Sequence, residues 1–208
     1  MFDLAQATDR DLVRLEVGEP DFDTPAHIVD AACEAARAGE THYTSNAGLP
    51  ELREAISNTL DREYDVTYDP EQFVVTNGGM EALHLGVLSV VEAGEELLIP
   101  SPSWPNYWTQ ARLADAVPVE IPMPEETGYA LDAERVIERM GEGTGAVVLC
   151  SPANPTGQVY DPDEMRAVVD AAAEHDAYVI ADEVYLGLTY DRDPVGLAAL
   201  TDHPEHVL

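Results

Sequence analysis

Apolar residues in this chain occur in two patterns, short continuous runs and longer stretches with helical spacing. The short apolar and β-branched runs predict five strands, at residues 73–76, 96–99, 117–121, 146–150 and 178–181. Apolar residues three and four positions apart predict helices between the strands, at about residues 25–38, 50–63, 80–91, 106–114, 132–140 and 161–175. The run 146–150 is apolar throughout, which is typical of a strand covered on both faces of its sheet.

Strands that alternate with helices at this spacing predict an α/β fold with a doubly wound, mostly parallel sheet and helices on both faces. We expect residues 1–25 to form an N-terminal arm and residues 26–208 to form one large domain. Thr24 is expected to cap the first helix and Pro25 to open it. The final residues, His206 to Leu208, look like the first step of another strand.

The charge balance is strongly acidic. The chain has 41 acidic and 10 basic residues, which gives a net charge of −31. All 10 basic residues are arginines, so the chain contains no lysine. The acids are interspersed between apolar segments rather than collected in a tail, which indicates a folded protein with a densely carboxylated surface, as in proteins adapted to high salt. Such a surface repels nucleic acid and anionic membranes at low ionic strength.

The two cysteines, Cys33 and Cys150, lie in apolar segments without the spacing of a metal site. We expect both to be buried free thiols, which suits a cytoplasmic protein, and we expect no metal. The chain does not open with a charged-then-apolar leader, and no apolar run approaches the roughly 18 residues of a membrane span. These features predict a soluble, intracellular protein.

Polar groups with chemical potential follow the predicted strands. Asp182 stands directly after the strand at 178–181, and Tyr185 follows three residues later. Chemistry in open α/β sheets gathers at the carboxyl ends of strands, where a carboxylate can pair with a cationic ring nitrogen and a phenol can donate to a nearby oxygen. Gly78 and Gly79 turn another predicted strand into a helix, and free N–H groups at such a helix start favour an anion.

Three further side chains fit the same kind of ligand. Trp104 offers a flat ring for stacking, Asn154 an amide for a phenolate oxygen, and Tyr43 a hydroxyl for a phosphate. Each group alone has an ordinary explanation, such as an acidic cap, a tight turn, a core tryptophan, an Asn-Pro turn or a surface tyrosine. Together they form the inventory of a pyridoxal 5′-phosphate (PLP) pocket.

With these groups in place, the sequence resembles the fold-type I PLP-dependent aminotransferases of class I/II, in the aspartate/alanine/aromatic aminotransferase branch. The matching motifs run through essentially the whole chain, at residues 18–25, 43–53, 76–82, 151–157 and 181–185. This resemblance implies the large PLP-binding domain of that fold, and amino-group exchange between an amino acid and a 2-oxo acid by a ping-pong mechanism.

The resemblance also implies roles around the cofactor ring. Asp182 would pair with the pyridinium nitrogen, and Trp104 would stack on the ring. Tyr185 and Asn154 would bind the O3′ oxygen.

The remaining implied roles concern the phosphate and the substrate. Gly78, Gly79 and Met80 would supply amides to the phosphate. Tyr43 would reach the phosphate of the neighbouring subunit's cofactor, which implies a homodimer, and Gly18 would lie near the substrate carboxylate. The family often has a small polar residue where this chain has Met80, so we expect only the backbone N–H to act there.

One departure from the family concerns catalysis. The Schiff-base lysine of these enzymes lies shortly beyond the strand that carries the Asp182 counterpart, and this chain has no lysine. Arginine cannot replace it, because its pKa is above about 12. We therefore expect an N-terminal portion of an aminotransferase, inactive alone. The alternatives are another fold-type I enzyme, such as a C–S β-lyase, a dehydratase or an aminocyclopropane-carboxylate-synthase-like lyase, a non-catalytic PLP-binding remnant, or one subunit of a split enzyme.

Overall fold

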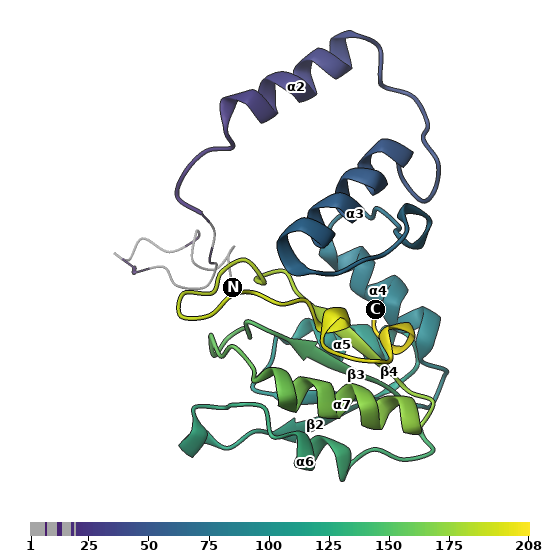
Figure 1. Ribbon diagram of the computed structural model, residues 1–208, viewed down its shortest axis with the longest axis vertical. Helices are drawn as coiled ribbons and strands as arrows, with labels where there is room; N and C mark the ends of the chain where they lie inside the picture. The colour runs from purple at the N-terminus through teal and green to yellow at the C-terminus, as the bar shows by residue number, and fades with distance from the viewer. Residues whose placement is uncertain (1–6, 8–11, 14–17, 19) are drawn as a thin grey trace. The chain divides into compact units, whose positions relative to one another are not determined.

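The computed structural model describes residues 7, 12–13, 18 and 20–208 (Figure 1). Most of the predicted N-terminal arm, residues 1–25, therefore lies outside the described residues. The chain divides into two compact units, residues 1–44 and 45–208, and each is described by itself. The predicted domain boundary after residue 25 remains a prediction.

The first unit contains the predicted first helix, α2 (Ala26–Arg37). The predicted cap at Thr24 is wrong, because Pro25 occupies the cap position and its carbonyl accepts the first backbone hydrogen bond, from Ile28 at 2.9 Å. The prediction of a buried thiol at Cys33 is also wrong: the side chain is exposed, since α2 has no buried residue.

The second unit is built on a four-stranded parallel sheet. Its strands are β1 (Glu96–Ser101), β2 (Val117–Pro122), β3 (Thr144–Cys150) and β4 (Tyr178–Asp182), in the order β2-β1-β3-β4. The chain first moves outward from β1 to β2 and then returns past β1 to β3. The sheet is therefore doubly wound, as predicted, and its topological switch point lies between β1 and β3.

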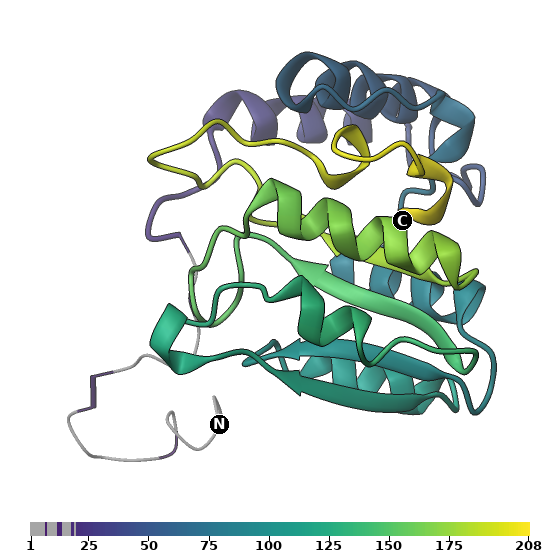
Figure 2. The ribbon, with the colours of Figure 1, turned by 60° about the horizontal axis from the view of Figure 1, so that its bottom comes forward.

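Helices cover both faces of this sheet, and each predicted helix is present. The helices α4 (Gly79–Val90) and α5 (Asn106–Leu113) pack on one face, and α6 (Ala133–Ile137) and α7 (Pro162–Glu174) pack on the other (Figures 1 and 2). Alternate strand residues serve the two cores, as the period-2 geometry of a strand requires. The buried strand residues on the α4 and α5 side are Leu97, Ile99, Ala146, Val148, Cys150 and Ile180, and those on the α6 and α7 side are Leu98, Ile121, Val147, Leu149 and Val179.

Capping side chains account for where two helices begin. Asp161 accepts a hydrogen bond from the backbone N–H of Asp163 at 2.9 Å, which confirms the predicted cap of α7. Asp132 caps α6 in the same way, accepting from the N–H of Arg135 at 3.2 Å, and α6 ends at Ile137, three residues earlier than predicted. The helix α3 (Pro50–Tyr64) begins at its proline, as predicted.

The predicted strand at residues 73–76 is wrong. The segment follows the short 3-10 helix η1 (Pro70–Gln72) as irregular backbone, because no described strand lies beside it to complete a ladder. The N–H of Val75 instead donates to the carbonyl of Ala47 at 3.0 Å. Gly48, with φ of 93°, lies so close that a Cβ there would be 2.6 Å from Cβ of Val75.

The end of the described chain does begin another parallel pairing. Val207 forms a parallel bridge with Val179, and the N–H of Leu208 donates to the Val179 carbonyl at 2.9 Å. His206 still belongs to the 3-10 helix η4 (Pro204–His206), so the strand-like pairing starts one residue later than predicted. Two further 3-10 helices are η2 (Glu125–Thr127) and η3 (Leu197–Ala199). Among the described helices, none has the length and apolarity needed to cross a membrane.

Candidate functional site

The candidate site lies at the carboxyl ends of the central strands. Ser101 ends β1 and Cys150 ends β3, on the two sides of the switch point where open α/β sheets bind ligands. The segments that follow β1, β3 and β4 carry Trp104, Asn154 and Tyr185. Parallel strands deliver these segments to the same edge of the sheet.

Asp182, the last residue of β4, is held by two donors. Its Oδ2 accepts a hydrogen bond from the Tyr107 hydroxyl at 2.6 Å, and its Oδ1 accepts one from the N–H of Val184 at 3.3 Å. Tyr107 is 1% exposed on α5. Burial raises the pKa of Tyr107 far above its usual value, and Cys150 and Asp182 raise it further, so the phenol keeps its proton and donates it.

Tyr107 also joins Trp104 and Cys150 to this acid. The Trp104 and Tyr107 rings meet edge to face, with centroids 5.6 Å apart and planes at 82°. The Cys150 thiol interacts with the Tyr107 hydroxyl and donates to the Pro152 carbonyl at 3.4 Å. Burial raises the pKa of Cys150, which confirms the predicted buried thiol at this position.

The predicted anion cradle is the start of α4. Gly78 is the N-cap residue with φ of 85°, a conformation that favours glycine, and the first N–H groups of the helix belong to Gly79 and Met80. Gly78, Gly79 and Met80 are exposed, and a Cβ at either glycine would meet nothing within 4 Å, so the helix start has free space beside it. The Met80 sulfur accepts from Nδ2 of Asn106 at 3.5 Å, which puts the cradle beside the start of α5.

A carboxylate organises the turn that precedes this cradle. Glu81, in the first turn of α4, accepts a hydrogen bond from the N–H of Asn77 at 2.5 Å. The Thr76 hydroxyl donates to the carbonyl of Gly78 at 2.9 Å. The negative charge of Glu81 also interacts favourably with the positive end of the helix dipole. The turn is therefore fixed from both sides while the amides of the helix start remain exposed.

Asn154 and Tyr185 are half-buried on the two adjoining segments. Backbone hydrogen bonds close the Asn154 turn, from Gly157 to the Ala153 carbonyl at 2.7 Å and from Ala153 to the Gln158 carbonyl at 2.8 Å. Tyr185 packs against the core cluster that contains Tyr107 and Cys150. The structure thus gathers the predicted residues of the second unit at one edge of the sheet.

The other two predicted residues lie in the first unit. Gly18 and Tyr43 are exposed there, and Tyr43 has no neighbour that covers its ring. Because the two units are described separately, these residues are not placed at the site, and their roles stay predictions.

The chemistry of this donor set fits PLP. The cofactor carries a phosphate dianion for the open amides at Gly79 and Met80, a pyridinium nitrogen for the Asp182 carboxylate, and a flat ring for Trp104. The described residues contain no group of three or more His, Cys, Asp or Glu side chains arranged to hold a metal ion.

Sequence reasoning missed Tyr107 and Glu81 as parts of the site. The signal for Tyr107 was available, because it stands three residues after Trp104 at the start of a predicted helix, one turn away on the same face. Its contact with Asp182, 75 positions later in the chain, depends on the sheet topology and could not be read from spacing.

Comparison with known proteins agrees with this geometry. The aminotransferase class I and II family profile matches residues 10–208. A probable aspartate aminotransferase from Methanocaldococcus jannaschii is 38% identical over 97% of this chain and 52% of its own length. An aspartate/prephenate aminotransferase from Thermus thermophilus is 40% identical over 95% of this chain and 51% of its own.

Solved structures give the same result. A tetra mutant of Thermus thermophilus aspartate aminotransferase is 39% identical, with a TM-score of 0.90 over 98% of this chain and 55% of the other. An aromatic aminotransferase from Pyrococcus horikoshii is 37% identical, with a TM-score of 0.89 over 98% and 55%. This chain spans about half the length of the relatives it matches. The chain belongs to the aminotransferase class I and II family.

Proposed function

We propose that this chain forms the PLP-binding half of an aminotransferase that exchanges an amino group between an amino acid and a 2-oxo acid. The observation that carries the proposal is the Asp182 carboxylate, fixed by Tyr107 at the sheet edge beside an open amide cradle. The names of the relatives, which include aspartate, aspartate/prephenate and aromatic aminotransferases, support the same reaction class.

When bound, PLP supplies an electron sink for the amino-acid carbon that exchanges its amino group. The Asp182 carboxylate accepts a hydrogen bond from the N–H of the pyridinium ring, and its negative charge favours the protonated form of that nitrogen. Tyr107 holds the carboxylate in place by donating a hydrogen bond to Oδ2. Trp104 holds the ring by stacking, and the amides of Gly79 and Met80 hold the phosphate.

The O3′ oxygen and the partner subunit complete the proposed site. Asn154 and Tyr185 donate hydrogen bonds to O3′, which stabilises its anionic form. Tyr43 binds the phosphate in the neighbouring subunit of a homodimer, and Gly18 lies near the substrate carboxylate. These roles rest on the matching motifs of the family.

The proton transfers of the reaction need a basic amine, and this chain has no lysine. The catalytic lysine must therefore come from residues outside these 208 or from a second chain. A non-catalytic PLP-binding protein is the second candidate, because the binding groups are present without that amine. Sequencing the transcript past the codon for Leu208 separates the two, since an aminotransferase requires a Ser-x-x-Lys segment in the same frame or in a co-purifying chain.

The decisive functional test uses the protein expressed from the whole reading frame that contains this chain. PLP and an amino acid such as aspartate, with 2-oxoglutarate as acceptor, should give the new amino acid with turnover. The C–S lyase and dehydratase alternatives need an amino acid with a thiolate or hydroxyl leaving group at Cβ, and a second assay with such a substrate should then give ammonia and a 2-oxo acid. PLP bound without any product from either assay would support the non-catalytic candidate.

The surface charge bears on where the protein works. We infer a protein adapted to high salt, because 41 acidic residues against 10 arginines and no lysine give a surface whose self-repulsion destabilises the fold at low ionic strength. A cytoplasmic location remains the expectation from the sequence. At high salt this self-repulsion is screened within a few ångströms.

A further inference from the structure

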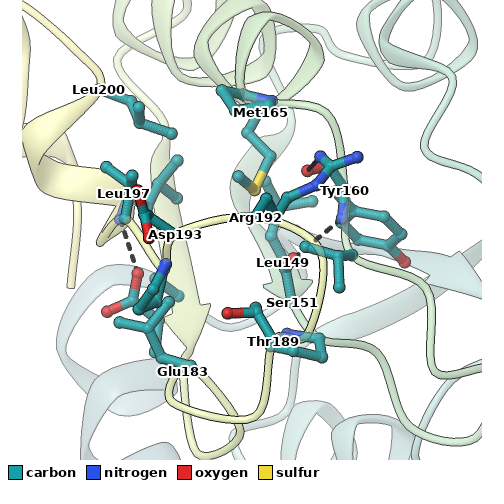
Figure 3. A pocket seen from close by; sticks show the side chains of 17 residues that line it. Leu149, Ser151, Tyr160, Met165, Glu183, Thr189, Arg192, Asp193, Leu197 and Leu200 are labelled. Atoms are coloured by element: carbon teal, nitrogen blue, oxygen red, sulfur yellow. Dashed lines mark hydrogen bonds between the residues drawn. The ribbon is translucent and has the colours of Figure 1, made fainter. Parts of the chain in front are cut away.

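Glu183 is a partly buried acid that has no role in the proposed site. Glu183 is the residue after Asp182. Its side chain lines a cavity of about 40 Å³, together with residues of α7 and of the segment after β4 (Figure 3). Within the described part of the chain, no arginine or histidine lies within ion-pair distance of Glu183. A buried carboxylate without a cationic partner has a cost, which calls for a structural reason.

The contacts of Glu183 close the base of a loop. Its Oε1 accepts a hydrogen bond from the N–H of Leu197, the first residue of η3, at 2.6 Å (Figure 3). Its backbone carbonyl accepts from the N–H of Leu186 at 2.9 Å. One residue therefore fastens both ends of residues 184–196, and a hydrogen bond to a carboxylate is among the stronger kinds.

The closed base is also tightly packed. A Cβ at Gly196 would lie 3.7 Å from Oε2 of Glu183 and would clash with Val66. The charge of Glu183 also adds to the burial that raises the pKa of Tyr68. Glycine at position 196 therefore leaves room for Val66 beside the loop base.

The same cavity borders the loop that carries Asn154. Ser151 accepts from the N–H of Tyr160 at 3.0 Å and so closes the segment 151–160 (Figure 3). The carbonyl of Tyr160 in turn accepts a long hydrogen bond, 3.5 Å, from Nη1 of Arg192 in the 184–196 loop. The loops of Asn154 and Tyr185 thus meet over one cavity, and Arg192 links them.

We propose that Glu183 is a positioning residue, which fixes the Tyr185 hydroxyl relative to Asn154 by fastening the base of the 184–196 loop. This inference rests on the proposed function, because Tyr185 and Asn154 are the donors to the O3′ oxygen of PLP. The expected consequence is that the loop anchored by Glu183 sets the acidity of O3′ without touching the cofactor.

The test uses the protein from the whole reading frame, unaltered and with the variants Glu183→Ala and Glu183→Gln. Hydrogen exchange at the amides of Leu186 and Leu197 measures the loop base without PLP. The pH midpoint of the absorbance of bound PLP measures the O3′ environment. Glu126→Gln, on exposed η2, removes the same charge and is the control.

We expect Glu183→Ala to speed exchange at Leu197 at least about tenfold and to move the absorbance midpoint, since a hydrogen bond to a charged group is lost. Glu183→Gln keeps an oxygen acceptor and should restore most of both properties. The positioning role is overturned if hydrogen exchange at Leu197 is unchanged in Glu183→Ala. It is also overturned if exchange is faster but the pH midpoint of the absorbance equals that of the Glu126→Gln control. An unaltered protein that binds no PLP overturns the proposed function, and the positioning role with it.

Discussion

The hydroxyl of Tyr107 lies 2.6 Å from Oδ2 of Asp182 and donates a hydrogen bond to it. The donor comes from α5, which follows β1, and the acceptor ends β4, which is separated from β1 by β3 in the sheet. Because the Tyr107 ring is buried, its hydroxyl cannot follow a displaced carboxylate. The fold therefore sets where the acid points before any ligand arrives.

Replacing this hydroxyl tests its contribution to binding. Tyr107→Phe keeps the buried ring but leaves Asp182 with the N–H of Val184 as its donor. We expect the Kd for PLP to rise about tenfold, the effect of losing one hydrogen bond to a charged group. Fluorescence titration of the protein from the whole reading frame measures it.

Tyr160→Phe is the matched control for that change. Tyr160 is also buried, and its hydroxyl makes no hydrogen bond within the described chain. The Kd of the Tyr160→Phe variant for PLP should stay within about twofold of that of the unaltered protein. Equal losses in both variants would show that α5 merely packs and that Tyr107 has no specific role toward the acid.

Alanine substitutions at two glycines should change the free energy of unfolding in opposite directions. Gly48→Ala forces a side chain to adopt φ of 93° at 2.6 Å from Val75, so the free energy of unfolding should fall by about 2–4 kcal/mol. Gly86→Ala, inside α4 with nothing within 4 Å of its Cβ, should raise it by about 0.5–1 kcal/mol. Urea unfolding compares the two. A harmless Gly48→Ala would contradict the close contact between the loop at Gly48 and the segment around Val75.

The Glu183 carboxyl should make the free energy of unfolding depend on pH. Burial raises the pKa of its carboxyl, the Leu197 N–H lowers it, and Asp182 raises it again, with a net rise. The folded protein therefore holds this proton more tightly than the unfolded chain, so its charged form is a destabilising feature at higher pH. The charge of Glu183 also adds to the rise in the pKa of Tyr68, and Arg192 lines the same cavity as Glu183.

The measurement is the free energy of unfolding of the unaltered protein and of Glu183→Gln from about pH 4 to pH 8, at constant salt. The difference should grow in favour of the glutamine variant as the pH rises through the ordinary carboxyl range, and then level off above the raised pKa. A difference that grows in favour of the unaltered protein would show that the Leu197 hydrogen bond outweighs burial.

Salt should stabilise the fold. With a net charge of −31, self-repulsion opposes the compact state, and chloride salts screen it. The urea midpoint should rise steeply between about 0.1 M and 1 M KCl, where the Debye length falls from about 10 Å to about 3 Å. A midpoint that is constant or falls over this range would contradict the proposed adaptation to high salt.

Local patterns predicted much of this fold. The continuous apolar run at β3 and the Asp161 cap of α7 depend only on neighbouring residues, and both predictions were confirmed. The segment at residues 73–76 has the composition of a strand, but a strand exists only with a partner, and no described strand lies beside it. Burial of Cys33 failed for the same reason, since α2 has no described surface that covers it.

In the candidate site as well, some residues were predictable from local sequence and others depend on tertiary contacts. Asp182, Trp104 and the glycines at the start of α4 were predictable, because strand ends and helix starts are readable from the sequence. The partners that hold the site were not, because the contacts of Tyr107 with Asp182 and of Glu183 with Leu197 join segments whose meeting depends on strand order and loop closure.

If Asp182 holds the ring nitrogen of PLP, as we propose, the substitution Asp182→Asn should weaken that interaction. The variant keeps the size of the side chain and an acceptor for Tyr107 but loses the charge that keeps the nitrogen protonated. In the protein from the whole reading frame, we predict a Kd for PLP raised at least about tenfold, with an absorbance spectrum that shifts with the loss of ring protonation. An Asp182→Asn variant that binds PLP with unchanged affinity and spectrum would contradict the account.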